Sequence, residues 1–365
     1  MRPRRCSSRG TLRSPWRASA SPGSEGSCGG QISRVPLGGP VDACDVCGAP
    51  AAHVIERSGR RLCDAHYVSY VERKVARAIS RYGMLRPRER IGVAVSGGKD
   101  SMSLLRILSR MAPRHGSELV ALVVHEGIGG HVEESHALAE AYARSLGISV
   151  LSASFEELFG RGLPDLVGRA PAGTSACSIC GPLRRRAIDV LARDAGVDVV
   201  ATGHHMDDFL QTFIIAMMEG DLKRIAWMHP GPKPDPEGRP RRVQPLVELY
   251  EEEVLGYARA AGVPFIACDC PYRRQGIRVR VRSFLRELES RSPGAKEIMF
   301  RSALAISRSL SGDIPRAEYV RCKHCGWPST SEVCNACSTL MSLVGEPINS
   351  GRALYDLGAR VGPGG

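Results

Sequence analysis

Apolar runs of strand length alternate with stretches of helical periodicity through the middle of the chain. The strand-like runs lie at 91–95, 119–124, 148–152 and 197–201, and helices are predicted near 101–112, 131–146, 177–194 and 205–218. Strands separated by helices have to run parallel, and a parallel sheet needs helices on both faces. The sequence therefore predicts an α/β fold built on a doubly wound parallel sheet.

Three polar segments follow directly after predicted strands, at Ser96–Ser101, His125–Gly130 and Gly203–Asp208. Ligands of open α/β sheets bind beyond the carboxyl ends of the strands. We therefore expect these segments to line one site. A Pro-, Gly- and charge-rich stretch at 229–242 is predicted to be a surface loop whose basic end either contacts nucleic acid or is a solvated linker.

The first polar segment, S-G-G-K-D-S, has the composition of a phosphate-binding loop. Its two glycines let the backbone approach an anion closely, and unpaired N–H groups at the start of the following helix point outward. The lysine adds a cation, the serines can donate hydrogen bonds, and the aspartate either caps the helix or helps to hold Mg²⁺. The candidate ATP-binding residues here are Ser96, Gly97, Gly98, Lys99, Asp100 and Ser101.

The third polar segment reads T-G-H-H-M-D-D. Asp207 and Asp208 lie in the first turn of a predicted helix, where adjacent carboxylates can bind Mg²⁺ on a pyrophosphate. Asp207 could instead be only a partner of the helix dipole, and His205 only a packed or exposed side chain. We expect Asp208 to be catalytic, and the remaining candidates for the ATP site are His125, Gly203, His204 and Asp207.

Thirteen cysteines are present, and eight of them form four C-x2-C pairs. In a chain of this size without an apparent secretory signal, such pairs indicate metal sites in a reducing cytoplasm rather than disulfides. A hairpin-like pattern turning at Ser58-Gly59 separates the first ligand pairs, and a double C-x2-C ribbon lies near the other end. Each set can complete a tetrahedral, structural Zn²⁺ site. The predicted ligands are Cys44, Cys47, Cys63 and His66 in the first site, and Cys322, Cys325, Cys334 and Cys337 in the second.

The formal net charge of +12 favours a polyanionic partner such as RNA or DNA. No apolar run reaches the roughly 18 residues of a membrane span, so none is expected. Residues 1–40 are expected to be a disordered tail or an overlong predicted start. The predicted organisation is a tail at 1–40, a zinc finger at 41–68, a nucleotide-binding domain at 69–312, a zinc ribbon at 313–342 and a second tail at 343–365.

Beyond the expected tail at 1–40, four cysteines belong to neither zinc module. Cys177 and Cys180 are one turn apart at the start of a predicted helix, where the helix dipole favours the thiolate. Cys268 and Cys270 follow much later in the chain. We expect three or four of these thiolates to converge on the sheet edge that carries the polar segments.

S-G-G-x-D-S after a strand is the PP-loop of the N-type ATP pyrophosphatases, which cut ATP between the α- and β-phosphates and activate a carbonyl oxygen as its adenylate. Over about residues 42–340 the chain resembles the tRNA 2-thiouridine synthetases of the TtuA type, which are related to cytosolic wobble-uridine thiolases. Six features carry this resemblance, in order: the N-terminal finger, the PP-loop, a central C-x2-C-G followed by basic residues, T-G-H-x-x-D-D, a C-P-Y segment leading to R-S-F-L-R-E-L-E, and the C-terminal ribbon.

The resemblance implies that Cys177, Cys180 and Cys270 hold a [4Fe-4S] cluster with one iron open to bind sulfide, and that Cys268 is spare. It implies that O2 of a tRNA uridine attacks ATP bound with Mg²⁺, and that sulfur then displaces AMP at C2. The implied partners are tRNA, a ubiquitin-like sulfur carrier protein and a second copy of the chain.

The chain differs from the family's common pattern at two positions. His125 stands where an acidic residue is common, and Arg184 stands where lysine is frequent. Because a guanidinium keeps its charge in any pocket, we expect Arg184 to stabilise the charge of the adenylate rather than to transfer a proton. The residues expected to be catalytic are Cys177, Cys270, Arg184 and Asp208.

Several alternatives remain open at this point. The central cysteines could hold a third zinc with Cys268 as fourth ligand, or Cys177 or Cys180 could carry a persulfide without iron. A PP-loop ligase without iron–sulfur chemistry and a non-catalytic zinc-ribbon RNA-binding protein are the competing functions. The motifs do not distinguish a T-loop uridine from the wobble uridine.

Overall fold

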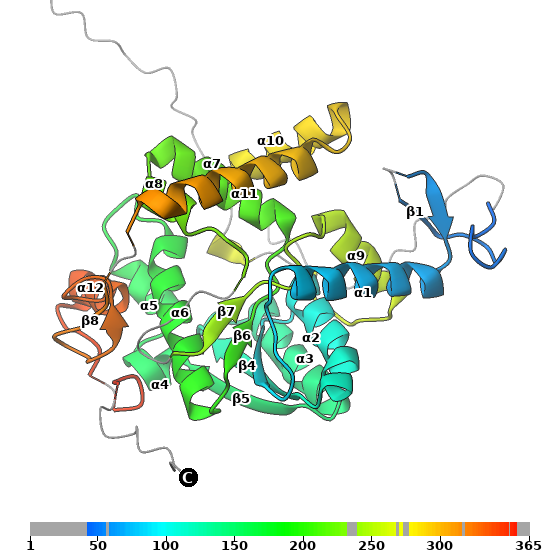
Figure 1. The fold of residues 1–365 in the computed structure, drawn as a ribbon. Coiled ribbons are helices and arrows are strands. Elements are labelled where there is room, and N and C mark those ends of the chain that lie inside the picture. Colours follow the sequence, from blue (N-terminus) through cyan, green and yellow to red (C-terminus); the bar gives the residue numbers. More distant parts are fainter. Residues whose placement is uncertain are drawn as a thin grey trace, which may run out of the picture. The chain divides into compact units, whose positions relative to one another are not determined.

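The computed structural model describes residues 42–55, 58–231, 239–267, 270–272, 277–315, 318–349 and 351–355, all within one compact unit. The predicted tail at 1–40, residues 350 and 356–365 of the predicted tail at 343–365, and Cys268 lie outside the described residues. The centre of the fold is a parallel sheet of five strands in the order β5-β4-β3-β6-β7 (Figure 1). These strands are β3 (Arg90–Val95), β4 (Glu118–His125), β5 (Ser149–Ser154), β6 (Val199–Ala201) and β7 (Arg241–Val243).

Helices cover the sheet on both faces, because successive buried residues of β4 pack into two different cores. Leu119, Ala121 and Val123 pack into one core with α2 (Lys99–Met111), α3 (His131–Ser145) and α9 (Glu251–Ala260). Their neighbours Leu122 and Val124 pack into a second core with α6 (Ala176–Asp194). A strand buried on both faces reads as one apolar run, which is why the doubly wound parallel fold was predictable.

The chain reverses its direction of travel across the sheet beside β3. It passes from β3 outward to β4 and β5, and then returns to place β6 on the other side of β3, with Val93 opposite Ala201. The carboxyl end of β3 therefore lies at the switch point, where sheets of this class bind their ligands. The loop at 96–101 follows directly from that end.

The stretch 229–242 was predicted as a loop, and this was wrong at its end. Arg241–Val243 forms the edge strand β7, which pairs with β6 through Val199 and Arg241. The segment Arg-Arg-Val offers only one apolar residue, and Val243 alone is fully buried. An edge strand of three residues needs little apolar sequence, because it gains its hydrogen bonds from a neighbour that the local sequence does not reveal.

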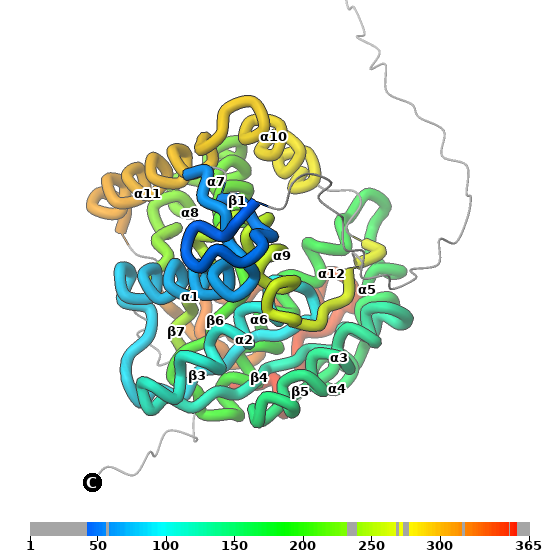
Figure 2. The backbone as a smooth tube through the Cα atoms, turned by 90° about the vertical axis from the view of Figure 1, so that its right-hand side faces the viewer, coloured from blue at the N-terminus to red at the C-terminus, as the bar shows by residue number. Residues whose placement is uncertain are grey.

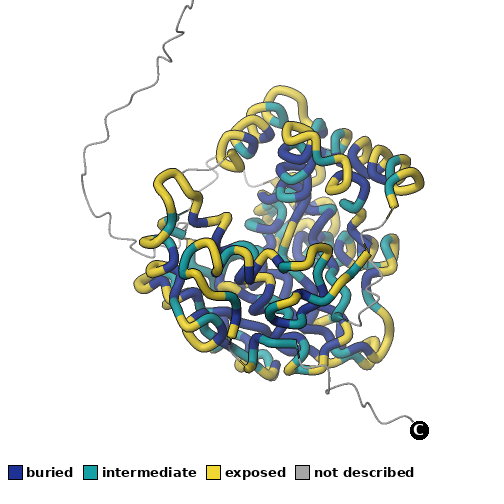
Figure 3. Tube along the Cα trace, turned by 90° about the vertical axis from the view of Figure 1, so that its left-hand side faces the viewer, coloured by how far each residue is buried: buried dark blue, intermediate teal, exposed yellow. Residues whose placement is uncertain are grey.

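The remaining helices lie around the central sheet (Figure 2). Long helices α1 (Asp64–Arg81), α7 (Met206–Glu219), α10 (Ile277–Arg291) and α11 (Ala295–Asp313) border one core, and short helices α4 (Phe155–Phe159), α5 (Leu163–Gly168) and α8 (Leu222–Ala226) fill connections. Buried segments concentrate in the interior, and exposed ones follow the outer loops and helix faces (Figure 3). In the described part of the chain, no helix has the length and apolar character needed to cross a membrane.

Two small cysteine-rich modules flank the sheet domain on opposite sides (Figure 1). The N-terminal module consists of the hairpin β1 (His53–Ile55) and β2 (Arg60–Leu62) together with the start of α1. The C-terminal module contains β8 (Val320–Arg321), β9 (Pro328–Ser329) and α12 (Asn335–Val344). Both lie where the cysteine spacing predicted them.

Candidate active site

The loop after β3 is shaped by a glycine that no other residue can replace. Gly97 has φ +76°, and a Cβ atom there would lie 2.1 Å from the backbone oxygen of Ser135. The serine hydroxyls fold the loop upon itself, since Ser101 Oγ donates to Gly98 O (3.1 Å) and accepts from Ser96 N–H (3.1 Å). Helix α2 begins directly after Gly98, so its first N–H groups are available to an anion.

The segment after β6 packs directly against this loop. A Cβ atom on Gly203 would lie 2.8 Å from Ser101 N, so glycine permits the two backbones to meet. His205, which sequence reasoning left without a role, is buried between two carboxylates: its Nε2 lies 3.4 Å from Asp208 Oδ2 and 3.8 Å from Asp100 Oδ1. His204 is exposed and its Nδ1 lies 2.8 Å from Thr202 Oγ1.

Asp207 and Asp208 have different surroundings although they are adjacent. Asp207 is buried, with Oδ1 accepting from Lys296 Nζ (2.7 Å) and Oδ2 accepting from Glu251 N–H (3.0 Å). Binding a nucleotide or metal through Asp207 would require breaking this pair. Asp208 is half-buried; burial acts to raise its pKa, but the imidazoles of His205 and His204 outweigh this and lower the pKa. Asp208 is therefore the better placed of the two to hold Mg²⁺.

His125 is the last residue of β4. Among the described residues, its hydrogen-bonding and ring contacts are with α3 and not with the loop after β3. Its Nε2 lies 3.1 Å from Glu140 Oε1, and its ring meets that of His136 edge-on at 4.8 Å. Its assignment to the ATP site thus depends on its position at the strand end alone.

The residue after His125 joins the strand end to the central cysteines. Glu126 is buried, and its Oε1 lies 2.6 Å from Arg184 Nε, while Arg184 Nη2 donates to Cys180 Sγ (3.1 Å). The other oxygen of Glu126 lies 3.3 Å from His136 Nε2. Burial disfavours the Arg184 cation, but Glu126, Cys180 and Cys270 together raise its pKa. Glu126 follows the carboxyl end of β4, which is the neighbour of β3. Cys180 therefore lies at the same edge of the sheet as the loop 96–101.

Cys270 follows shortly after a residue that contacts the loop. Four residues before it, Ile266 N–H donates to Gly97 O (3.2 Å). Cys270 itself is half-buried against the core that contains Cys180. Burial raises the pKa of the Cys180 thiol to about 11, with Arg184 opposing the shift. Cys177 is exposed in the first turn of α6.

The central thiols are spread more widely than the ligands of a single ion. Within the described ranges, only the two peripheral modules bring three or more ligand atoms within 4.8 Å of one another. Cys177, Cys180 and Cys270 are not among these groups, so the described residues do not bring them together as the ligands of a single tetrahedral ion. The Arg184 guanidinium would partly neutralise a negatively charged cluster held there.

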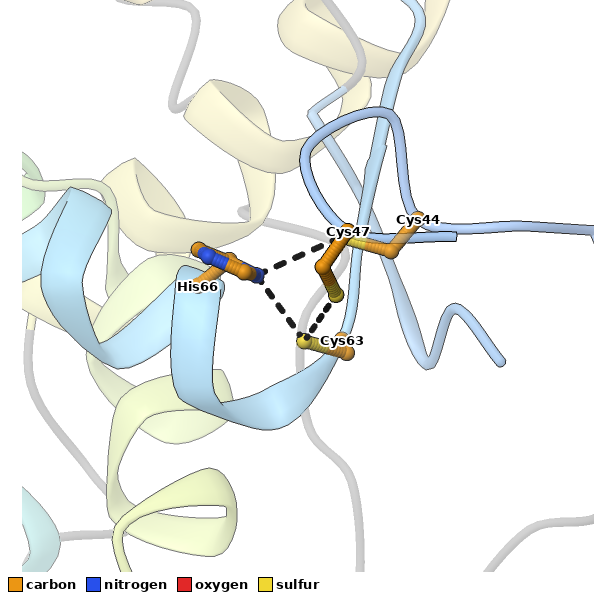
Figure 4. A group of neighbouring side chains, drawn as sticks. All are labelled: Cys44, Cys47, Cys63 and His66. Carbon is orange, nitrogen blue, oxygen red and sulfur yellow. Dashed lines mark hydrogen bonds between the residues drawn. The ribbon is translucent and has the colours of Figure 1, made fainter. Parts of the chain in front are cut away.

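Both peripheral modules have the donor sets and spacing of zinc sites. In the N-terminal one, His66 Nδ1 lies 3.2 Å from Cys63 Sγ and 3.5 Å from Cys44 Sγ, and Cys47 Sγ is 3.8 Å from Cys63 Sγ (Figure 4). In the C-terminal one, all four ligands are buried: Cys322, Cys325, Cys334 and Cys337. Three thiolates with one imidazole, or four thiolates, complete a tetrahedral zinc ion and leave no open position.

Sequence reasoning missed several residues that organise the site. Glu251 and Arg282 lie in α9 and α10, for which no part in the site was predicted, yet Glu251 accepts from Lys99 Nζ (3.2 Å) and from Arg282 Nε (3.1 Å). Glu126 lies in the polar segment His125–Gly130, but no role was predicted for it. The run of arginines at 184–186 was the available signal for charged contacts on α6, but not for their different partners.

A glycine-shaped anion loop at the switch point of a parallel sheet, next to paired carboxylates, defines an ATP-using protein of the PP-loop class. The model of the PP-loop domain matches residues 68–288. The tRNA-5-methyluridine(54) 2-sulfurtransferase of Pyrococcus horikoshii is 33% identical over 295 residues, covering 80% of this chain and 92% of the relative. The tRNA 2-thiolation protein NcsA of Haloferax volcanii is 32% identical over 318 residues, covering 82% and 98%.

A solved structure agrees with these relatives. The U34-tRNA thiolase NcsA from Methanococcus maripaludis with its [4Fe-4S] cluster superposes with a TM-score of 0.70 at 29% identity, covering 82% of this chain and 96% of that one. The chain therefore belongs to the PP-loop family of tRNA 2-thiolation proteins. The predicted family membership is confirmed.

Proposed function

We propose that this chain is an ATP-dependent sulfurtransferase that converts a tRNA uridine to 2-thiouridine. The observation that carries the proposal is that three elements follow the carboxyl ends of the neighbouring strands β4, β3 and β6. They are the loop with Gly97 after β3, the segment with Asp208 after β6, and Cys180, which Arg184 links to Glu126 after β4. Nucleotide activation and sulfur delivery require such proximity, because the activated base must meet the sulfur before water does.

In this proposal the loop residues Ser96–Ser101 and the start of α2 bind the phosphates of ATP, with Gly203 and His204 beside them. Asp208 and Asp100 hold Mg²⁺ near the pyrophosphate. The uridine O2 attacks the α-phosphate and pyrophosphate leaves; a sulfur nucleophile then attacks C2, and AMP leaves with the original oxygen. Arg184 stabilises the negative charge that develops on the adenylate.

Cys177, Cys180 and Cys270 would hold a [4Fe-4S] cluster, which supplies an open iron for sulfur when bound. Two Zn²⁺ ions would occupy the peripheral modules and stabilise them without taking part in the reaction. The net charge of +12 suits a tRNA substrate, whose phosphates are contacted without reading the sequence. We further propose a ubiquitin-like sulfur carrier as donor, a homodimeric assembly and a cytoplasmic location, where reduced thiols persist.

The site of modification separates two candidates. One relative is named for uridine 54 and the solved structure for uridine 34. Mass spectrometry of tRNA from a deletion strain identifies which 2-thiouridine disappears.

Two experiments test the function itself. Replacing Lys99 with Ala should abolish thiolation in a complemented deletion strain; unchanged thiolation would leave only a non-catalytic RNA-binding role. Anaerobic purification should yield protein containing iron and labile sulfide, and both should fall in the Cys180→Ser variant. Colourless protein with full ATP-dependent activity would instead favour a PP-loop ligase or persulfide chemistry.

A further inference from the structure

Three cations converge on one buried carboxylate beside the nucleotide loop. Glu251 begins α9 and is 6% exposed. It accepts from Lys99 Nζ (3.2 Å), from Arg282 through both Nε (3.1 Å) and Nη2, and from Arg286 Nη2 (3.2 Å). Lys99 is the first residue of α2, directly after Gly98, whereas both arginines belong to α10. The Glu251 oxygen Oε1 is shared by Lys99 and Arg282.

A second ion pair, between Asp207 and Lys296, holds the backbone of Glu251 in place. The backbone N–H of Glu251 donates to Asp207 Oδ2 (3.0 Å), and Asp207 Oδ1 accepts from Lys296 Nζ (2.7 Å). Lys296 is 1% exposed, so this pair cannot easily rearrange. Asp207, expected from the motif to face the nucleotide, therefore anchors the start of α9 instead.

Glu251 remains ionised throughout the physiological range. Burial acts to raise its pKa, but Lys99 and Arg282 outweigh this and hold the pKa at about 2. Glu251 therefore competes with any phosphate for Lys99.

We propose that Glu251 is a positioning residue of the nucleotide site, which gathers Lys99, Arg282 and Arg286 around one carboxylate and releases Lys99 to the phosphates when ATP binds. The inference rests on the proposed use of ATP at this loop. It assigns Arg282 a role that the motif alone does not reveal: it stays paired with Glu251 and keeps that carboxylate from recapturing Lys99. Asp100 Oδ2 also accepts from Lys99 Nζ (3.0 Å), and the three cations with these two carboxylates still leave the cluster net positive, as a site for a polyanion requires.

Two variants with opposite signs test this arrangement by calorimetric titration of MgATP without tRNA. Glu251→Gln keeps the size of the side chain but removes the competing charge, so the Kd for MgATP should fall about tenfold. Turnover should nevertheless fall, because Lys99 and the α10 arginines lose their common anchor. Arg282→Gln leaves Glu251 to hold Lys99 more firmly, so the Kd should rise about fivefold. An unchanged Kd in both variants, or shifts of the same sign, would overturn the proposal.

A matched control distinguishes positioning from the general stability of α9. Glu253 lies in the same first turn and pairs with Lys74 Nζ (2.6 Å), away from the loop. Glu253→Gln should leave the Kd for MgATP within about twofold of the wild type. If the Kd for MgATP also fell tenfold in Glu253→Gln, the effect of Glu251→Gln would be due to helix stability or net charge, not to positioning of Lys99.

The link to Lys99 itself is tested in the double variant. In a Lys99→Met background, Glu251→Gln should change the Kd by less than about twofold, since the competed cation is gone. An undiminished effect would refute the role of Lys99. Wild-type protein that fails to bind MgATP at all would refute the proposed function; binding by the wild type with unresponsive variants refutes only this inference.

Discussion

The two zinc-type modules share their chemistry but not their surroundings. In the N-terminal module only Cys44 is buried, Cys47 is exposed, and Cys63 and His66 are intermediate. In the C-terminal module all four cysteines are buried, and they belong to the core that packs on α6.

The two modules also differ in the negative charge that their surroundings must compensate. Four thiolates around Zn²⁺ carry a net charge of about −2, whereas three thiolates and a neutral imidazole carry about −1. A buried dianion needs compensation. Arg186, which is buried on α6, provides it by donating to Cys325 Sγ (3.2 Å) and Cys334 Sγ (3.1 Å) while its guanidinium stacks over Trp327 at 4.3 Å. The N-terminal module faces water and has no such need.

The C-terminal ribbon is thus part of the core of the sheet domain. Arg186 and Arg184 are two residues apart on α6 and so point to different sides, one to the ribbon and one to Cys180. The ribbon therefore braces the helix that carries Cys177 and Cys180. The N-terminal module contacts the domain through α1, where Tyr67 Oη donates to Glu253 O (3.3 Å).

The largest expected difference between the modules is in the stability lost when one zinc ligand is replaced. Cys337→Ser should lower the free energy of unfolding by about 3 kcal/mol or more, because it opens a buried structural site. Cys47→Ser, at an exposed ligand, should cost about 1 kcal/mol or less. Denaturant unfolding with zinc quantification measures both. Equal losses would show that burial does not distinguish the modules.

Removing the compensating cation should have the next largest effect. Arg186→Met should destabilise the protein by about 2 kcal/mol and promote zinc loss from the ribbon, because it leaves the buried thiolates unpaired. Arg186→Lys keeps the charge and should retain zinc, although it loses the planar contacts. Hydrogen exchange of the α6 amides should increase in the Met variant. If α6 stays protected while zinc is lost, the ribbon does not brace the helix.

Chelation should release the two proposed zinc ions at different rates. The N-terminal zinc should leave about tenfold faster than the C-terminal one, since its ligands are reached without opening the core. A colorimetric chelator assay on the wild type and on Cys47→Ser assigns the fast phase, which should be absent in the variant. A single phase for both ions would contradict the comparison.

The smallest effect is expected beside the exposed module. His53 Nε2 lies 2.7 Å from Asp64 Oδ1, and its ring stacks on Tyr67 at 4.0 Å. Because Asp64 is largely exposed, His53→Ala should cost less than about 1 kcal/mol and leave zinc bound. Thermal unfolding and metal content check this. Loss of zinc in this variant would reveal a firmer dependence on His53 than the contacts suggest.

The sequence by itself determined the elements and the chemistry available to them. Local sequence was enough to predict the parallel sheet, the loop and both metal modules, because each signal lies within a short stretch of the chain. These signals are the strand-length apolar runs, S-G-G-K-D-S, T-G-H-x-x-D-D and the cysteine spacings. The edge strand at Arg241–Val243 escaped because its pairing, not its composition, makes it a strand.

Only the tertiary structure decided which charged side chains meet. Nothing local separates Asp207 from Asp208, or Arg184 from Arg186; their partners are Lys296, His205, Glu126 and the ribbon thiols, which come from distant parts of the chain. Glu251 was indistinguishable from its neighbours in a run of three glutamates. Its burial against Lys99 and Arg282 arises from the packing of α9, α10 and the loop, and an ion pair between such elements has no signature in sequence.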